Sequence, residues 1–180
     1  PQSYNNAKDF FDVGTTINNS LNITQGFEKG SYSFSLGSTN ANGIVPSTGL
    51  DRYTAKLSGE ARLSEKWTTG FSGNFISSRV TKQTGANNGI MATVLPAPAS
   101  YDLAGIPSHV LGNPYAQNTY RTTGGFDAAY WAVDNNVFLE KNNRFFGNGY
   151  GQYATSLAEG HKLTLKYQLG IDSYTTNYSD

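Results

Sequence analysis

The sequence contains no cysteine, few charged residues and little to suggest an ordinary soluble domain. Without cysteine, a disulfide framework and thiol chemistry are both excluded. Charged residues make up 14% of the 180 positions, against about 25% in typical soluble domains. Lys plus Arg and Asp plus Glu number 13 each, so no net positive charge points to nucleic acid as a partner. The chain is instead rich in glycine, tyrosine and phenylalanine, which favours β-structure with long loops.

The sequence also has no long apolar run. Its most apolar stretch, GIMATVLPAPA, is shorter than the roughly 20 residues that a membrane-spanning helix needs, and it contains Pro96 and Pro98. No charged and then apolar leader is present, and the first residue is Pro1 rather than an initiator methionine. We therefore expect the chain to be a processed product or a piece of a longer protein.

Residues 51–63, DRYTAKLSGEARL, alternate between two kinds of side chain. Every odd position from 53 onward is apolar or small, and every even position is polar or charged. The spacing of Arg52, Lys56 and Glu60 would suit one face of a helix, but at about 100° per residue the odd set would scatter around it. At about 180° per residue the odd set falls on one side. The segment is therefore predicted to be a strand with two different faces.

The same alternation recurs along the chain and predicts six strands, over 15–25, 31–38, 51–63, 67–79, 144–156 and 162–174. Three tight turns, at 26–30, 64–66 and 157–161, alternate with two long loops, at 39–50 and 80–143. In an antiparallel sheet, alternate connectors lie at the same end. One end of the sheet should therefore carry only tight turns, and the other end should carry both long loops.

Strands of about ten residues with this asymmetry are typical of outer-membrane β-barrels, whose apolar side faces lipid and whose polar side faces a wet lumen. The predicted fold is an all-β, antiparallel transmembrane β-barrel arc, since six strands are fewer than the roughly eight that close a barrel. Aromatic girdles at the two interfaces are expected from Tyr32 and Trp67 beside tight turns and from Tyr53 and Phe145 beside long loops. The alternative is a soluble β-sandwich, whose apolar side packs on a second sheet.

Three stretches carry a likeness to a known family. NNSLNITQGFEKGSYSFSLG at 18–37 is followed by GIVPST at 43–48 and the alternating strand. LPAPASYD at 95–102 precedes NPYA, and AYWAVDNN at 129–136 precedes NRFFGNGYGQY at 143–153. In this order and spacing they resemble the SusC/RagA-like TonB-dependent outer-membrane transporters. Gly149 and Gly151 depart from the family's pattern, which usually has larger apolar residues on a lipid-facing strand.

The resemblance implies a 22-stranded barrel in the bacterial outer membrane, plugged by an N-terminal domain that lies outside this sequence. Such a barrel imports oligosaccharides or peptides with energy from the TonB complex, works with a SusD-like surface lipoprotein and is surrounded by outer-membrane lipids. Two other functions remain open at this point. One is a passive porin or adhesin barrel, and the other is a soluble carbohydrate-binding β-sandwich.

Patterns that would indicate an enzyme, a cofactor or a metal site are weak. The histidines, His109 and His161, are predicted at opposite ends of the sheet, which does not favour a shared metal. Asp127 and Asp134 match no known calcium loop. The sequence has no G-x-S-x-G, no phosphate-binding loop and no cysteine nucleophile. We expect no catalytic activity, no cofactor and no metal.

The long loop collects aromatic and amide side chains, a mixture that suits sugars and peptides because rings stack on apolar faces and amides pair with hydroxyls. The alternative, which the length of the loop favours, is that the rings pack the loop on itself or on a partner protein. A helical turn is expected near 89–94, before Pro96. The candidate residues for contact with cargo or a partner are Tyr101, Tyr115, Tyr120, Tyr130, Trp131 and Asn113, accompanied by Phe126, Asn87, Asn88 and Asn118.

Overall fold

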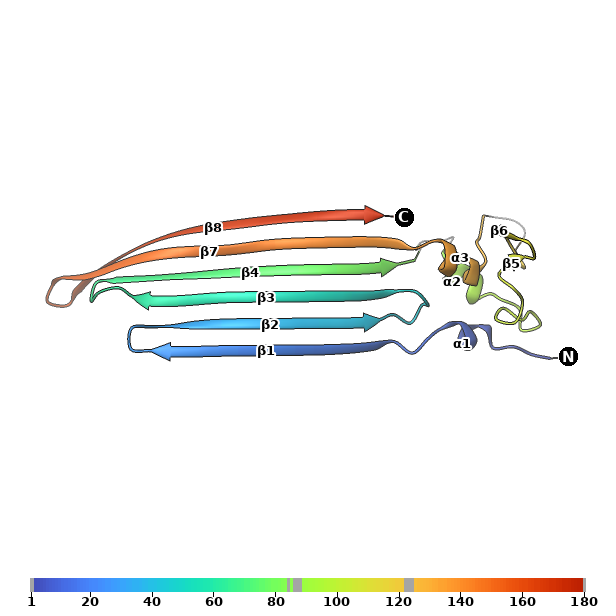
Figure 1. Ribbon diagram of the computed structural model, residues 1–180, viewed down its shortest axis with the longest axis horizontal. Helices are drawn as coiled ribbons and strands as arrows, with labels where there is room; N and C mark the ends of the chain where they lie inside the picture. Colours follow the sequence, from blue (N-terminus) through green and yellow to red (C-terminus); the bar gives the residue numbers. More distant parts are fainter. Residues whose placement is uncertain (1, 84, 86–88, 122–124, 180) are drawn as a thin grey trace.

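The computed structural model describes residues 2–83, 85, 89–121 and 125–179, and most of them form one antiparallel sheet. Figure 1 shows six strands side by side in a single layer, with the remaining elements gathered at one end. They follow the order of the sequence: β1 (Thr15–Phe27), β2 (Gly30–Asn42), β3 (Gly49–Arg62), β4 (Trp67–Lys82), β7 (Phe138–Ala158) and β8 (His161–Ser179). The prediction of an all-β fold with six antiparallel strands is thus confirmed.

The connectors alternate between the two ends of the sheet as predicted. Tight turns at 28–29, 63–66 and 159–160 lie at one end, which we call the turn end. The last of them contains Gly160, whose φ of 80° is a conformation that glycine adopts readily. The connectors 43–48 and 83–137 both lie at the opposite end, which we call the loop end. His109 and His161 accordingly lie at opposite ends of the molecule.

The strands continue further toward the loop end than predicted. The predicted bounds of the loop over 39–50 are wrong at both ends, because β2 extends to Asn42 and β3 begins at Gly49. The loop predicted over 80–143 is also too long, since β4 reaches Lys82 and β7 begins at Phe138. The strand predicted to end at 174 continues to Ser179. In these extensions polar residues occupy both faces, so the hydrophobic alternation fades while the backbone pairing continues.

The pairing register defines two faces, because directly paired residues point to the same side of a sheet. Leu57 pairs with Phe34 on one side and Gly73 on the other. We call the face of Leu57 the apolar face and the face of Lys56 the polar face. The apolar face carries even positions of β2 and odd positions of the other five strands. The β4–β7 pairing has no bulge, and it places Gly149 opposite Phe71 on the apolar face.

No second layer covers either face of the sheet within the described residues. On the apolar face, Tyr53 is 54% exposed, Leu57 47% and Leu63 67%. On the polar face, Lys56 and Glu60 are exposed as well. A β-sandwich buries one face of each sheet against the other. The described residues therefore do not form the sandwich that the alternative interpretation requires.

The buried hydrophobic side chains of the described residues gather at the loop end. They belong to α1 (Asn6–Phe10), α2 (Met91–Val94), α3 (Ala129–Asn135) and nearby coil, which together with the hairpin of β5 (His109–Val110) and β6 (Asn113–Gln117) we call the loop unit. α2 confirms the helical turn expected near 89–94. None of the helices in the described part of the chain is long and apolar enough to cross a membrane. The core consists of Phe10, Ile90, Val94, Leu103, Ala129, Ala132 and Val133.

Candidate functional site

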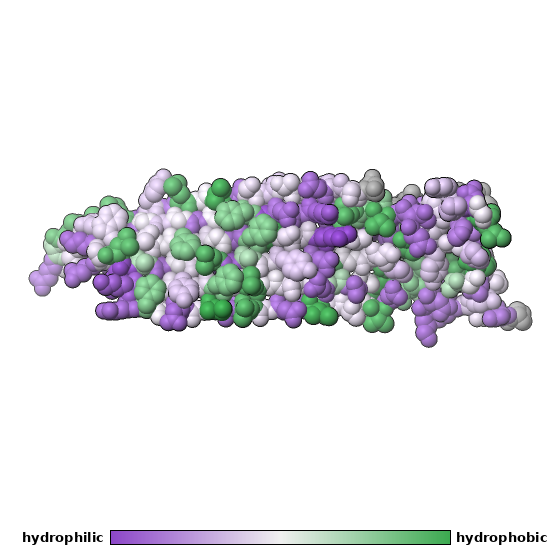
Figure 2. Space-filling view, in the orientation of Figure 1, coloured by the Kyte–Doolittle hydropathy of each residue, from purple (hydrophilic) through white to green (hydrophobic). Residues whose placement is uncertain are grey.

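A continuous apolar band crosses the apolar face between the turn end and the middle of the sheet. Along β3 and the residue after it, the band extends from Ala55 to Leu63, about 27 Å at roughly 3.4 Å per residue, which is about 21 Å along the membrane normal for a strand tilted by about 40°. Outer-membrane barrels carry an apolar band of about 25 Å. Figure 2 shows hydrophobic side chains gathered over this part of the strands. The band includes Leu21, Ile23, Phe34, Leu36, Leu57, Phe71, Phe75, Phe145, Leu165, Leu169 and Ile171.

The band ends sharply toward the loop end, although the strands continue. The next row on the same face contains Tyr53 but otherwise only polar side chains: Asn19, Ser38, Ser77, Asn143 and Thr175. Asn19 Nδ2 donates to Ser38 Oγ at 3.4 Å within this row. One row further lie Asn40, Asp51, Arg79, Lys141 and Asn177. On β3, β4 and β7 the same face therefore changes from apolar to charged within four residues, whereas β1 carries the exposed Ile17 in this row.

Aromatic side chains lie at both limits of the band. At the turn end, the rings of Trp67 and Tyr153 are 5.1 Å apart, and Trp67 is half exposed. At the loop end, Tyr53 is the one aromatic residue in the otherwise polar row, and Phe145 lies one row inside it. Trp and Tyr are enriched where a protein passes from hydrocarbon to water. The positions of Trp67 and Tyr53 fit the interfacial girdles expected from the sequence, whereas Tyr32, which pairs with Gly59, lies within the band.

The polar face carries charged groups that interact across the strands. Arg144 Nε donates to Asp172 Oδ1 at 2.9 Å, from β7 to β8. The Tyr150 hydroxyl donates to Glu60, and Lys166 Nζ lies 4.1 Å from the centre of the Tyr150 ring. The charged groups among these are exposed, and ion pairs in water contribute little to stability. Sequence reasoning placed Glu60 on the polar side of its strand, but it missed these contacts because they depend on the register between strands.

Four of the predicted contact residues are partly buried by contacts within the loop unit. The rings of Tyr101 and Tyr120 are 5.3 Å apart, and Tyr120 donates a hydrogen bond to the Thr93 carbonyl. Burial raises the pKa of both phenols. Tyr130 packs on Phe10 with ring centres 5.1 Å apart, and Trp131 Nε1 donates to the Pro114 carbonyl at 2.9 Å. These contacts match the alternative interpretation, in which the rings pack the loop on itself.

Tyr115 and Asn113 lie differently, on the exposed β5–β6 hairpin. Tyr115 is 86% exposed, and Asn113 Oδ1 accepts a hydrogen bond from the Tyr115 backbone N–H at 3.1 Å. Leu111, on the same hairpin, is 97% exposed. Asn87 and Asn88 lie outside the described residues. Among the predicted candidates that the structure describes, Tyr115 and Asn113 on this hairpin present an aromatic ring and an amide side chain together to solvent.

Other polar side chains of the loop unit form contacts within the unit itself. Asn118 Nδ2 donates to the carbonyls of Pro107 and His109, at 2.8 and 3.0 Å. Asp127 accepts from Gln117 Nε2 at 2.7 Å, so this carboxylate holds β6 against the start of α3. Arg121 lies over the Phe126 ring, 3.7 Å from its centre. No group of three or more potential metal ligands occurs within the described ranges.

The N-terminal segment is fastened to the long loop through Asn6. Its side chain is buried, with Nδ2 donating to the Pro98 carbonyl at 3.1 Å and Oδ1 accepting from Leu103 N–H at 3.0 Å. Tyr4 N–H adds a bond to the Ala99 carbonyl at 2.8 Å. Segments more than ninety residues apart in the sequence are therefore joined directly at the loop end of the sheet. No sequence pattern predicts this contact, because an asparagine that becomes buried cannot be told from any other polar loop residue.

The fold is an open antiparallel sheet with one apolar and one polar face. This class of fold is consistent with an arc of a β-barrel wall. No family model matches the chain. The chain is 29% identical over 164 residues to TonB-dependent receptor P26 of Formosa agariphila. The alignment covers 87% of this chain but 15% of the relative, so the chain spans a small part of that protein's length. This similarity supports the TonB-dependent receptor family and does not distinguish the SusC/RagA subtype.

Proposed function

We propose that this sheet is part of the barrel wall of an active outer-membrane importer. The observation that carries the proposal is the apolar band, which is uncovered by protein in the described residues and is bounded by a polar row at the loop end. Exposed apolar side chains on such a face are stable in contact with lipid. Strands in lipid must also have every backbone group paired. The similarity to a TonB-dependent receptor supports an outer-membrane location and a transport role for the whole protein.

The two edge strands support the proposal that further strands continue the sheet. β1 and β8 are each paired along one edge in this chain, and β8 is 19 residues long. An unpaired edge is not tolerated in hydrocarbon. We propose that other strands of the full protein pair with both, in a barrel of the 22-stranded kind. The polar face, with Lys56, Glu60 and Arg144, then faces the wet lumen.

The finer proposal is a SusC-like importer for oligosaccharides or peptides that works with a SusD-like lipoprotein at the loop end. Its support is the sequence resemblance together with the exposed hairpin, where Tyr115 can stack on a sugar or peptide and Asn113 can pair with polar groups. The role is one of transport, with no catalytic step, cofactor or nucleic acid. A passive porin remains the competing function, and energy coupling separates the two.

Uptake by the full-length protein in whole cells tests this function. We expect labelled oligosaccharides or peptides to enter cells that carry the gene, and entry to stop when a protonophore collapses the inner-membrane proton gradient. TonB-linked import needs that gradient, whereas diffusion through a porin does not. A matched strain without the gene provides the background. Uptake that continues unchanged after the gradient is lost would support the porin instead.

The hairpin ring gives a second prediction, for the variant Tyr115→Ala. We expect cargo uptake to fall roughly 2- to 10-fold, since an aromatic contact contributes about 0.5–1.5 kcal/mol. The level of barrel in the outer membrane should not change, because Tyr115 packs on little else. Initial uptake rates measure the effect. Leu111→Ala is the control on the same hairpin, and an equal loss in both variants would argue against a role specific to the ring.

A further inference from the structure

We propose that the polar face binds an uncharged sugar chain near the loop end of β7 and β8, on the rings of Tyr174 and Tyr178. The inference rests on the proposed importer, whose lumen this face lines. It goes further because it places a cargo site on the barrel wall itself and favours uncharged sugars over peptides as the cargo. Three features of the wall carry it: exposed rings, hydrogen-bonding groups beside them, and charges that cancel.

The two tyrosine rings lie on the lumen side and are open to solvent. Tyr174 is 71% exposed and Tyr178 is 72% exposed. Tyr174 is paired with Arg144 and Tyr178 with Glu140, so both rings point to the polar face. They are four residues apart on β8, about 14 Å at roughly 3.4 Å per residue. That distance exceeds the width of one sugar ring, so only a chain of several sugars stacks on both.

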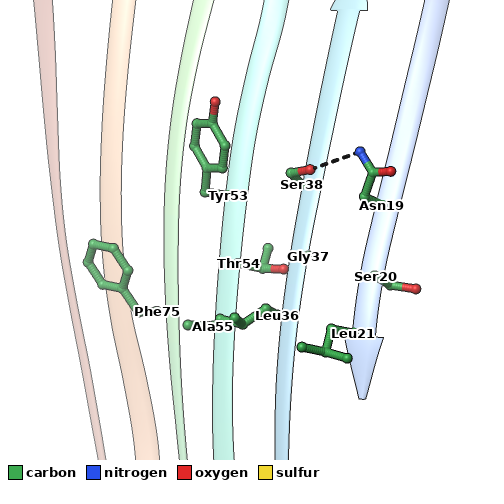
Figure 3. Close-up of a pocket in the computed structure, with 10 residues that line it drawn as sticks. All are labelled: Asn19, Ser20, Leu21, Leu36, Gly37, Ser38, Tyr53, Thr54, Ala55 and Phe75. Carbon is green, nitrogen blue, oxygen red and sulfur yellow. Dashed lines mark hydrogen bonds between the residues drawn. The ribbon is translucent and has the colours of Figure 1, made fainter. Parts of the chain in front are cut away.

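A role in the interfacial girdle does not explain these two rings. On the apolar face, Tyr53 lies in the row next to that of Tyr174. Figure 3 shows the apolar side chains that lie toward the turn end from Tyr53 and line a depression with it: Leu21, Leu36, Ala55 and Phe75. On the polar face, the positions of β8 that follow Tyr174 toward the turn end are Asp172, Gly170 and Gln168. No apolar band begins there along β8, so its tyrosines do not mark the edge of one.

Hydrogen-bonding groups lie between and beside the rings. Thr176 is the residue of this face between the two tyrosines, and its Oγ1 accepts from Asn142 Nδ2 at 3.3 Å. Arg144 donates through Nε to Asp172 Oδ1 at 2.9 Å, yet its side chain is 48% exposed. An arginine has five N–H donors, so some remain for a ligand. Sugar hydroxyls both donate and accept, and they can pair with these groups while the rings contact the apolar faces of the sugars.

The charges of this part of the wall cancel. On the polar face of β4, β7 and β8, the described residues between the rows of Lys82 and Asp172 carry charges in two ion pairs. Lys82 pairs with Glu140, and Arg144 pairs with Asp172. A charged ligand therefore gains no net attraction here. A free peptide carries a charged amine and a charged carboxylate at neutral pH, so the wall favours an uncharged sugar chain.

Calorimetric titration of the full-length protein in detergent with a panel of ligands tests the site. The panel contains uncharged hexasaccharides of glucose, mannose, galactose and xylose, the four monosaccharides, hexagalacturonate and a set of hexapeptides. We expect an uncharged hexasaccharide to bind most tightly, at least about fivefold better than its monosaccharide, since each further ring contact contributes about 2- to 10-fold. A peptide or hexagalacturonate as the tightest ligand, or no binding across the panel, would overturn the proposal.

A matched pair of ring variants locates the site. Tyr174→Ala/Tyr178→Ala should bind the best hexasaccharide at least about fivefold more weakly, while affinity for the monosaccharide changes less. Tyr53→Ala removes a ring at nearly the same height from the apolar face, and it should bind like the wild type. Unchanged binding by the double variant, or an equal loss in Tyr53→Ala, would overturn the site.

A second pair tests the cancelled charges. Asp172→Asn leaves Arg144 without its partner and should raise the affinity for hexagalacturonate about 2- to 5-fold, the range expected for an exposed charge. Asp51→Asn makes the same change on the apolar face and should have no effect. No difference between these two variants would contradict a cargo site on this wall.

Barrel formation and uptake are measured separately, by heat-modifiable gel mobility and by energy-dependent entry of cargo. A folded barrel with normal uptake that does not depend on Tyr174 and Tyr178 would reject this site and leave the proposed function standing. Absence of a barrel in the wild type would reject the proposed function itself.

Discussion

Leu57→Arg is expected to block assembly of the barrel in the outer membrane. Leu57 lies near the middle of the apolar band and is 47% exposed, so in the proposed barrel its side chain meets hydrocarbon. A charged arginine at the bilayer midplane costs about 2–4 kcal/mol on the lipid face of a barrel. The amount of full-length protein that reaches the outer membrane in a folded, protease-resistant form measures the effect. We expect it to fall at least tenfold.

Lys56→Leu is the matched control, one residue away on the polar face of the same strand. Removing a charge that faces a wet lumen carries no such cost, so assembly should stay within about twofold of the wild type. The two positions lie on the same strand at nearly the same depth, so the variants differ mainly in the face to which the side chain points. Equal losses for both variants would mean that the two faces have been assigned wrongly.

Phe10→Ala is expected to unfold the loop unit while leaving the sheet assembled. Phe10 is 1% exposed and packs on Phe11 and Tyr130, with ring centres 5.2 and 5.1 Å away. Replacing a buried phenylalanine with alanine costs about 3–5 kcal/mol. The core of the loop unit is small, so a loss of this size removes most of its stability. Extracellular protease on intact cells should then cleave within residues 89–136 at least tenfold faster.

Tyr115→Ala is the control for this experiment, because it removes an aromatic ring from the same unit at an exposed position. Its cleavage rate should match that of the wild type. The amount of Phe10→Ala barrel in the membrane should also be unchanged, since Phe10 lies beyond the ends of the strands. Loss of the whole barrel in Phe10→Ala would mean that the loop unit and the sheet fold as one cooperative unit.

The sequence was most informative where one face of the chain is apolar and the other polar. From Tyr53 to Leu63 the alternation alone identified the strand and its two faces. From Thr39 to Asn42 it failed, because polar side chains lie on both faces of the strand there and no apolar–polar alternation marks it. Backbone pairing continues there without any hydrophobic signal. Strand ends at the loop end therefore could not be read from the sequence.

The candidate site shows a similar limit. Sequence reasoning found the aromatic residues of the long loop, but it could not separate the partly buried ring of Tyr130 from the exposed ring of Tyr115. That difference depends on contacts with Phe10, which lies 120 residues earlier in the chain. Likewise, Arg144 and Asp172 become neighbours only through the register of β7 with β8. Long-range pairing of this kind leaves no local pattern.

Spin labels along β3 test the central claim most directly. These 180 residues contain no cysteine, so single substitutions to cysteine at positions 53 to 63 each give one labelling site within them. In the full-length protein in lipid vesicles, labels at odd positions should collide mainly with oxygen, which concentrates in hydrocarbon. Labels at even positions should collide mainly with a water-soluble nickel complex. Equal accessibility at odd and even positions, or odd positions shielded from both reagents by protein, would contradict a sheet with one face in lipid.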